Sequence, residues 1–147
     1  MPFLLDTDHL SILHRRSQPE CDRLVARLAQ YPADDIATTI ISFHELVKGW
    51  MAYLNRSRTS EHVVRAYGEL EIIWRSFCKM NVISFGPEAE HWFTELRKQG
   101  IRIGTMDLRI ACVGLETASV VLTRNHVDFE KVPGLRVEDW TEATTKD

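Results

Sequence analysis

The sequence predicts an α/β fold in which helices cover both faces of a mostly parallel sheet. Short apolar runs of strand length alternate with longer amphipathic segments, and no repeat, low-complexity tract or linker interrupts them. This alternation is typical of parallel sheets, whose strands are joined by crossover helices. A chain of 147 residues suits one domain, expected here over residues 1–147. Such folds carry their functional groups at the carboxyl ends of the strands, near a change in strand order.

Five short apolar runs are expected to form the strands. They are "FLLD" (3–6), "IATT" (36–39), "VIS" (82–84), "SVVLT" (119–123) and "LRVEDW" (135–140). Each is too short for a typical helix and is separated from the next by a segment with helical periodicity.

Two longer segments are expected to form amphipathic helices over residues 42–54 and 59–78. Their apolar stripes are Leu46, Val47, Trp50, Met51 and Leu54 in the first, and Val63, Tyr67, Leu70, Trp74 and Phe77 in the second. Apolar residues at three-to-four spacing usually face a core. An alternative is that these stripes, with Trp50 and Met51, form an apolar groove for a second copy of the chain or for a partner helix.

Three further helices have recognisable starts. One begins near His9 and could be capped by Asp6 or Asp8, and another covers 87–98 with Pro87 as its first residue. The third covers 105–117, with Thr105 as its expected N-cap. After Arg109 this segment is apolar nearly all round, which predicts a buried central helix whose first turn faces a pocket.

Composition and charge exclude several classes of protein. Hydrophobic residues make up 44% and charged residues 27%, and no run has the length of a membrane span or the pattern of a signal peptide. The net charge of −3 argues against a simple basic nucleic-acid-binding module, although an enzyme could still reach phosphates through a bound metal. The three cysteines form no CxxC pair and are expected to be buried or incidental thiols in a reducing cytoplasm.

Four acids follow successive structural units, and each also has an ordinary structural explanation. Asp6 could be a turn or cap residue, and Glu45 could form a capping box with Ser42. Asp107 would interact favourably with the dipole of its helix, and Asp128 could lie in a surface loop after the strand over 119–123. Together, however, all four lie at the edge of the sheet where the chemistry of such folds is found.

A shared position for these acids would require a cation. Two unit charges 4 Å apart repel by about 4 kcal/mol at an effective dielectric constant near 20. Carboxylate oxygens with open positions between them suit Mg²⁺ or Mn²⁺. The expected chemistry is hydrolysis of a phosphodiester by metal-activated water. The sequence contains no recognisable Ser–His–Asp or Cys–His set and no Gly-rich phosphate loop.

The sequence resembles the PIN-domain ribonucleases, specifically the VapC-type toxins of type II toxin–antitoxin systems. The matching segments are "FLLDTDHLSIL", "ISFHELVKG", "IGTMDLRIA" and "LTRNHVDFEKVPGLRVEDW". The resemblance implies a three-layer α/β/α domain with about five mostly parallel strands and a homodimer in solution. It also implies Mg²⁺-dependent cleavage of tRNA or another structured RNA, and inhibition by an antitoxin. By position, Asp6, Glu45 and Asp107 match the three core acids of the family.

The chain departs from the family pattern at two places. Asp8 stands where the family often has Asn, and the fourth polar ligand varies between the positions of Asn125 and Asp128. We expect Asp128 to bind the metal or its water, and Asn125 to be an orienting group. The amide carbonyl of Asn125 could also reach the same cavity. Thr105 and Thr123 are candidates for hydroxyl groups that support the acids.

Other polar residues have weaker assignments. Six cations near the third and fourth acids could bind RNA phosphates or simply be solvated: Arg97, Lys98, Arg102, Arg109, Arg124 and Lys131. His9 and His126 flank acids, but a surface role is expected for them rather than proton transfer.

Two other functions remain as alternatives. A PIN-like module could bind RNA or a protein without cleaving. Asp-x-Asp after a strand also begins the haloacid-dehalogenase phosphatases, but their pattern continues to Thr or Val where this chain has Leu10. Their later acid pair is also missing, since Asp34-Asp35 precedes a strand instead of following one.

Overall fold

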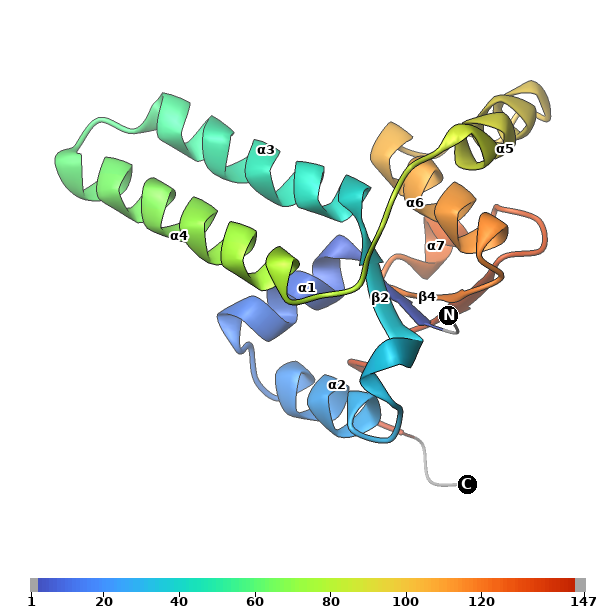
Figure 1. Ribbon diagram of the computed structural model, residues 1–147, viewed down its shortest axis with the longest axis horizontal. Helices are drawn as coiled ribbons and strands as arrows, with labels where there is room; N and C mark the ends of the chain where they lie inside the picture. Colours follow the sequence, from blue (N-terminus) through green and yellow to red (C-terminus); the bar gives the residue numbers. More distant parts are fainter. Residues whose placement is uncertain (1–2, 145–147) are drawn as a thin grey trace.

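The computed structural model, which describes residues 3–144, contains a five-stranded parallel sheet. The strands are β1 (Phe3–Leu5), β2 (Ile36–Thr39), β3 (Val82–Ile83), β4 (Val120–Leu122) and β5 (Arg136–Glu138). Their spatial order is β3-β2-β1-β4-β5, with helices on both sides of the sheet (Figure 1). The predicted α/β class is confirmed, and each predicted strand agrees with the observed one to within two residues at either end.

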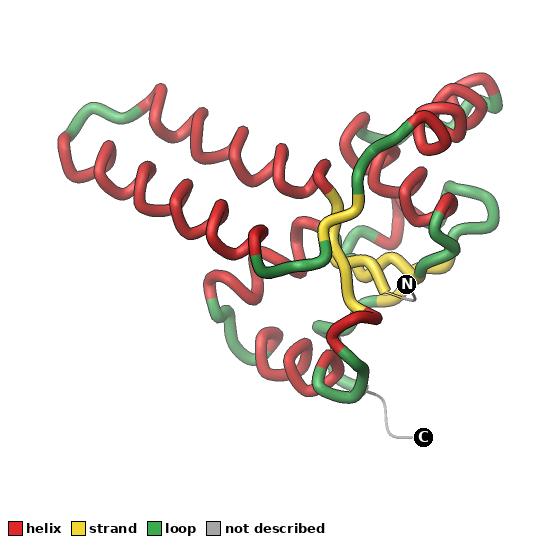
Figure 2. The backbone as a smooth tube through the Cα atoms, in the orientation of Figure 1, coloured by secondary structure: helices red, strands yellow, loops and turns green. Residues whose placement is uncertain are grey.

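Seven α-helices connect and cover the strands. They are α1 (Thr7–Arg15), α2 (Glu20–Leu28), α3 (Ile40–Arg56), α4 (Ser60–Cys78), α5 (Pro87–Lys98), α6 (Thr105–Glu116) and α7 (His126–Phe129), with a 3-10 turn at Ala33–Asp35. Helices α3 and α4 form a long hairpin that extends away from the sheet (Figure 2). The sequence did not predict α2, whose buried side chains are only Cys21 and Leu24, or α7, which has four residues.

The sheet separates two apolar cores because successive side chains of a strand point to opposite faces. In β1, Leu4 lies in one core while Phe3 and Leu5 lie in the other, and Val121 of β4 joins Leu4. Helices α5, α6 and α7 supply the first core, and α1, α2 and α4 supply most of the second. A parallel sheet buried on both faces explains why its strands read as continuous apolar runs.

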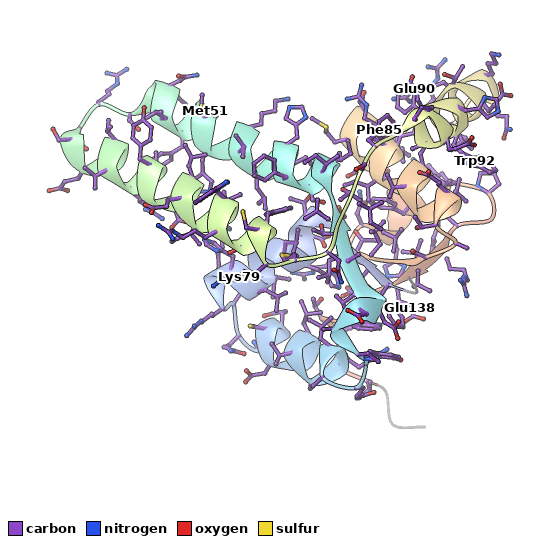
Figure 3. The ribbon with its side chains drawn as sticks, viewed as in Figure 1. Met51, Lys79, Phe85, Glu90, Trp92 and Glu138 are labelled. Atoms are coloured by element: carbon purple, nitrogen blue, oxygen red, sulfur yellow. The ribbon has the colours of Figure 1, made fainter. Side chains whose placement is uncertain are left out.

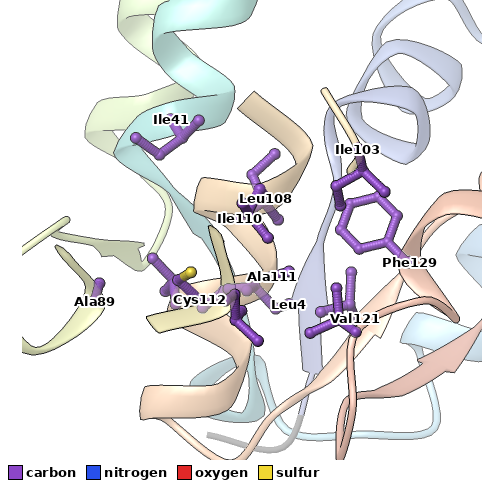
Figure 4. Packing of buried hydrophobic residues seen from close by; sticks show 14 residues of the cluster. Leu4, Ile41, Ala89, Ile103, Leu108, Ile110, Ala111, Cys112, Val121 and Phe129 are labelled. Atoms are coloured by element: carbon purple, nitrogen blue, oxygen red, sulfur yellow. The ribbon is translucent and has the colours of Figure 1, made fainter. Parts of the chain in front are cut away.

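Helix α6 is the most deeply buried helix, as its apolar sequence predicts. Its side chains pack between the sheet and neighbouring helices, with Leu108, Ile110 and Ala111 fully buried (Figure 4). This packing holds the amino end of α6 beside the carboxyl ends of β1 and β4.

The apolar stripes of α3 and α4 are less buried than expected. Tyr67 and Trp74 are 59% and 57% exposed, so their assignment to the core was wrong. Phe77 of the predicted stripe is buried, together with Ala66 and Ile73, and in α3 the predicted Leu46, Val47 and Trp50 are partly buried against the same core. Met51 is also exposed and points away from α4, as Figure 3 shows. The hairpin projects beyond the sheet, so no other element within residues 3–144 covers its outer faces (Figure 2).

Two predicted caps were also wrong. The first is the capping box of Ser42 and Glu45, because α3 is capped by Thr39, whose hydroxyl oxygen accepts a hydrogen bond from the backbone N–H of Ser42. Gly104, not Thr105, is the N-cap of α6, and it provides no side-chain hydrogen bond.

The three cysteines are free thiols, with Cys21 and Cys112 buried and Cys78 exposed. Among the described residues, no helix combines the length and apolar character needed to cross a membrane.

Candidate metal centre

Asp6 lies at the carboxyl end of β1 and is only 4% exposed. One oxygen, Oδ1, caps α1 by accepting the backbone N–H of Thr7 at 2.7 Å. The other, Oδ2, accepts the hydroxyl of Thr123, which follows β4, also at 2.7 Å. The Asp6 carboxylate therefore caps α1, as the sequence predicted, and also lies in the candidate site.

Glu45 reaches the same place from the second turn of α3. Its Oε1 accepts a hydrogen bond from the hydroxyl of Thr7 at 2.7 Å. The predicted capping box is wrong, because the N–H of Ser42 already bonds to Thr39 and Glu45 turns toward α1 instead. The sequence did not identify Thr7, although a hydroxyl residue between Asp6 and Asp8 at the start of a helix was a usable signal.

Asp107 enters from the first turn of α6 and is linked to Asp128 through Asn125. The amide Nδ2 of Asn125 donates to Asp107 Oδ2 and to Asp128 Oδ2, each at 3.1 Å. Asn125 therefore contacts the acids through its amide N–H and not through its carbonyl, and it lies where it can orient both carboxylates, as expected of an orienting group. Asp128 lies in α7 rather than in a loop, and Lys131 contacts its other oxygen at 3.4 Å.

Three of the four predicted acids converge. One carboxylate oxygen from each of Asp6, Glu45 and Asp107 lies within 4.8 Å of the other two. Asp128 lies outside this group. None of the ion pairs found among residues 3–144 includes Asp6, Glu45 or Asp107. Three carboxylates without a protein cation form a donor set that fits a hard divalent ion such as Mg²⁺ or Mn²⁺.

The electrostatics of the cluster agree with this fit. Burial, and then the negative charge of Asp8, raise the pKa of Asp6 to about 7 despite the hydrogen bonds from Thr123 and Thr7. Burial, and then the charge of Glu45, raise the pKa of Asp107 to about 6. In both groups the raised pKa disfavours the charged carboxylate, first because burial removes it from water and then because a neighbouring acid is also negative.

Asp8 was considered as a helix cap or as a metal ligand, but its observed contacts are with the segment after β4. Its Oδ2 accepts the backbone N–H of Arg124 at 2.8 Å and lies 3.2 Å from the Thr123 hydroxyl, so Asp8 joins α1 to the segment after β4. The predicted contact of Thr123 with the acids is thus present. Thr105 instead accepts a long hydrogen bond from Arg97 and does not contact the acids.

The cations expected near the site have varied surroundings. The guanidinium groups of Arg97 and Arg109 lie against the ring of Phe93, and Lys98 pairs with Glu95. Arg102 and Arg124 have exposed side chains. His126 lies 3.3 Å from Glu130 at the surface, whereas His9 is fully buried, so its expected surface role was wrong.

Comparison with known proteins adds independent information. No family model matches the chain. Ribonuclease VapC1 of Haemophilus influenzae strain R2866 is 26% identical over 141 residues, covering 96% of this chain and 99% of the relative. The tRNA(fMet)-specific endonuclease VapC of Salmonella typhimurium is 41% identical over 46 residues, which cover 31% of this chain and 35% of that protein.

A solved structure matches over the same extent. VapBC-1 from nontypeable Haemophilus influenzae superposes with a TM-score of 0.73 at 25% identity, covering 97% of this chain and 100% of the matched chain. The predicted PIN-like α/β/α fold is confirmed by this match together with the five-stranded parallel sheet. The chain is thus similar to VapC ribonucleases over nearly its full length, and the shared fold and the converging acids support a PIN-domain protein of the VapC type.

Proposed function

We propose that this chain is a metal-dependent endoribonuclease that acts as the toxin of a toxin–antitoxin pair. The observation that carries the proposal is the convergence of Asp6, Glu45 and Asp107 without a protein cation. The ribonuclease activity named for VapC1 of Haemophilus influenzae supports the same reaction. The substrate class we propose is tRNA or another structured RNA, which the tRNA(fMet)-specific relative supports.

In this proposal Asp6, Glu45 and Asp107 hold Mg²⁺, or Mn²⁺ in its place, and Asp128 supports the site through Asn125. A bound ion of this kind supplies an activated water and offsets charge on the leaving oxygen of a phosphodiester. Thr7 and Thr123 orient the carboxylates by donating hydrogen bonds to Glu45 and Asp6. Asn125 keeps Asp107 and Asp128 at a fixed separation.

RNA binding would use the exposed cations beside this edge of the sheet. Arg124 directly follows Thr123, and Arg102 precedes α6. Guanidinium groups at these positions can bind phosphates, which would give salt-dependent binding without reading base sequence. The RNA preference would then depend on the shape of the substrate.

Control by an antitoxin is supported by the match to VapBC-1. A cavity of about 470 Å³ lies between α1, α3 and α4, with Leu10, Leu46, Trp50, Ile73 and Phe77 among its lining residues. We propose that an amphipathic helix of the antitoxin lies against this apolar surface. Homodimer formation, a single domain over residues 1–147 and a cytoplasmic location also belong to this proposal.

The function is tested by Asp6→Asn, with Asp34→Asn as a matched control on the exposed turn before β2. Purified wild-type protein is expected to cleave structured RNA in Mg²⁺, and EDTA should abolish cleavage because the acids alone hold no activated water. Asp6→Asn should lose cleavage while keeping its circular dichroism spectrum, whereas Asp34→Asn should retain it.

The matching cellular experiment is end-mapping of RNA after induction of the chain, with and without the neighbouring reading frame. We expect discrete new RNA ends and growth arrest that the neighbouring gene relieves. Undiminished cleavage by Asp6→Asn would overturn the assignment of the site. No cleavage of any RNA in Mg²⁺ or Mn²⁺ would favour a non-catalytic RNA- or protein-binding module.

A further inference from the structure

His9 is a fully buried polar residue that the proposed chemistry does not use. Both nitrogens of its ring have partners. Nδ1 lies 2.8 Å from Oδ1 of Asp8, and Nε2 lies 3.2 Å from the backbone nitrogen of Trp140. Asp139 also approaches Nε2, with its Oδ1 at 3.6 Å. The ring therefore connects the first turn of α1 to the segment after β5.

The partners of the ring determine where its proton lies. The backbone N–H of Trp140 can only donate, so Nε2 must accept that hydrogen bond. A neutral imidazole then carries its proton on Nδ1, from which it donates to the carboxylate of Asp8. One tautomer of His9 satisfies both contacts.

The Trp140 end of this connection is firmly held. The Trp140 side chain is 1% exposed, and its ring lies against the rings of Phe3 and Tyr31 at centroid distances of 4.6 and 5.3 Å. Its indole nitrogen donates to Glu138 at 2.7 Å, and the guanidinium of Arg27 lies over the ring. The backbone N–H that bonds to His9 thus has a fixed position.

The Asp8 end leads to the acidic site. Asp8 Oδ2 accepts the N–H of Arg124 and lies near the Thr123 hydroxyl, and that hydroxyl also bonds to Asp6. Asp8 therefore anchors the segment that forms one wall of the site.

We propose that His9 is a positioning residue of the acidic site: its Nδ1–H fixes Asp8, and through Asp8 it fixes Thr123 and Arg124 beside Asp6. Its effect on cation binding rests on the proposed function, because it assumes that Asp6, Glu45 and Asp107 hold a divalent ion. The effect on Asp8 and Arg124 does not need that assumption.

Two substitutions at His9 separate its two hydrogen bonds. In His9→Asn, the shorter amide lies near the position of Nδ1, so it can still donate to Asp8 but cannot reach Trp140. In His9→Gln, the longer amide reaches the position of Nε2 and can accept from Trp140, but it leaves Asp8 without this donor. Both variants remove the same buried ring, so each serves as the control for the other.

The first measurement is the affinity for Mn²⁺ by isothermal titration calorimetry on the full chain. We expect His9→Gln to weaken Mn²⁺ binding by about 10-fold, which is the smallest loss of affinity usual when a residue that hydrogen-bonds to a metal ligand is replaced. We expect the affinity of His9→Asn to stay within about 2-fold of wild type. Equal weakening in both variants would indicate a packing role and overturn the proposal. Unchanged affinity in His9→Gln would overturn it as well.

The second measurement uses the metal-free protein and is independent of any cation. In ¹⁵N–¹H spectra, the amide signal of Arg124 should shift in His9→Gln and stay in place in His9→Asn. If wild type binds no Mn²⁺, the proposed metal site fails, and an unmoved Arg124 signal in His9→Gln would separately overturn the role of His9.

A third measurement needs no variant and covers the case in which His9→Gln does not fold. The ¹⁵N resonances of the imidazole in wild type report which nitrogen is protonated. A proton on Nδ1 supports the proposal, and a proton on Nε2 with a bare Nδ1 overturns it.

Discussion

Asp6 uses its two carboxylate oxygens for two different contacts. Oδ1 caps α1 and Oδ2 accepts the hydroxyl of Thr123, which leaves the group almost completely buried. Hydrogen bonds to a carboxylate lower its pKa, yet the pKa of Asp6 is raised to about 7 because burial and the charge of Asp8 are the larger effects. A carboxyl held in this way favours a proton or a metal ion as its neighbour.

The raised pKa of Asp6 predicts how the stability of the metal-free protein depends on pH. A carboxyl with a higher pKa in the folded state binds its proton more tightly there, so the contribution is fully present below about pH 4. It is lost as the pH rises toward 7, by on the order of 4 kcal/mol at 1.36 kcal/mol per pKa unit. Urea unfolding in EDTA between pH 4 and pH 8 measures this loss.

Asp6→Asn should show a smaller loss over the same range, because Asn does not titrate. The remaining slope should end near pH 6, where Asp107 finishes its own titration in the same direction. Asp34→Asn is the control and should keep the slope of wild type. Parallel curves for wild type and Asp6→Asn would contradict the assigned shift.

Among the elements, α6 shows how packing sets the position of a ligand. It carries Asp107 in its first turn and Gly114 near its other end. A Cβ atom at Gly114 would lie 2.8 Å from Cγ2 of Val121 in β4 and 3.0 Å from Cδ1 of Leu135. Glycine therefore allows α6 to approach the sheet closely, and this approach brings Asp107 to the end of β1.

Substitution of glycines in two helices should have opposite effects on stability. Gly114→Ala is expected to destabilise the protein by about 1–3 kcal/mol, because the added methyl overpacks against buried Val121. Gly68→Ala, at an exposed position of α4 with nothing within 4 Å of the new Cβ, should stabilise it by about 0.5–1 kcal/mol. Free energies of unfolding in urea give both values.

The contrast between the two positions is the control, since the chemical change is the same. Equal effects of Gly114→Ala and Gly68→Ala would show that α6 does not pack on β4 as closely as the distances indicate. A further consequence for Gly114→Ala is weaker Mn²⁺ binding, because a displaced α6 moves Asp107 away from Asp6.

For the whole molecule, the strand order decides where the site lies. The chain passes from β1 to β2 and β3 on one side, then returns to β4 and β5 on the other. The order thus changes direction between β1 and β4, and side chains from the ends of these strands meet there. Asp6, Glu45 and Asp107 come from the start, the first third and the last third of the chain, so any ion they share would join these parts.

Binding of Mg²⁺ should therefore raise the melting temperature of the entire domain. At a free concentration 100 times the dissociation constant, binding to the folded state stabilises by about 2.7 kcal/mol. For a chain of this size that corresponds to roughly 5–10 °C. The shift should be larger at pH 8 than at pH 5, because at pH 5 the ion must displace protons from Asp6 and Asp107.

Differential scanning calorimetry with and without Mg²⁺ measures the effect. Glu45→Gln should remove most of the shift, since it takes away one of the three carboxylates while keeping the acceptor for Thr7. A shift of the same size at both pH values, or one that persists in Glu45→Gln, would mean that the ion binds elsewhere.

The sequence alone was sufficient for the elements that depend on local patterns. The five strands and the helices of residues 87–98 and 105–117 follow from apolar periodicity and from Pro87, which act over a few neighbouring residues. Asp6, Glu45 and Asp107 were singled out by their places near the ends of strands and by the resemblance to the PIN-domain family, and the structure brings them together. Helix α2 was missed because its charged sequence buries only Cys21 and Leu24.

Only the tertiary structure decided how the acids are held and which surfaces are buried. Glu45 accepts a hydrogen bond from Thr7 instead of bonding to Ser42, and Asn125 contacts the acids through its amide N–H rather than its carbonyl. His9 is fully buried. Each outcome depends on a contact between residues distant in sequence, and local periodicity carries no information about such contacts. The exposure of Tyr67 and Trp74 has the same origin, because a helical stripe is buried only where another element packs against it.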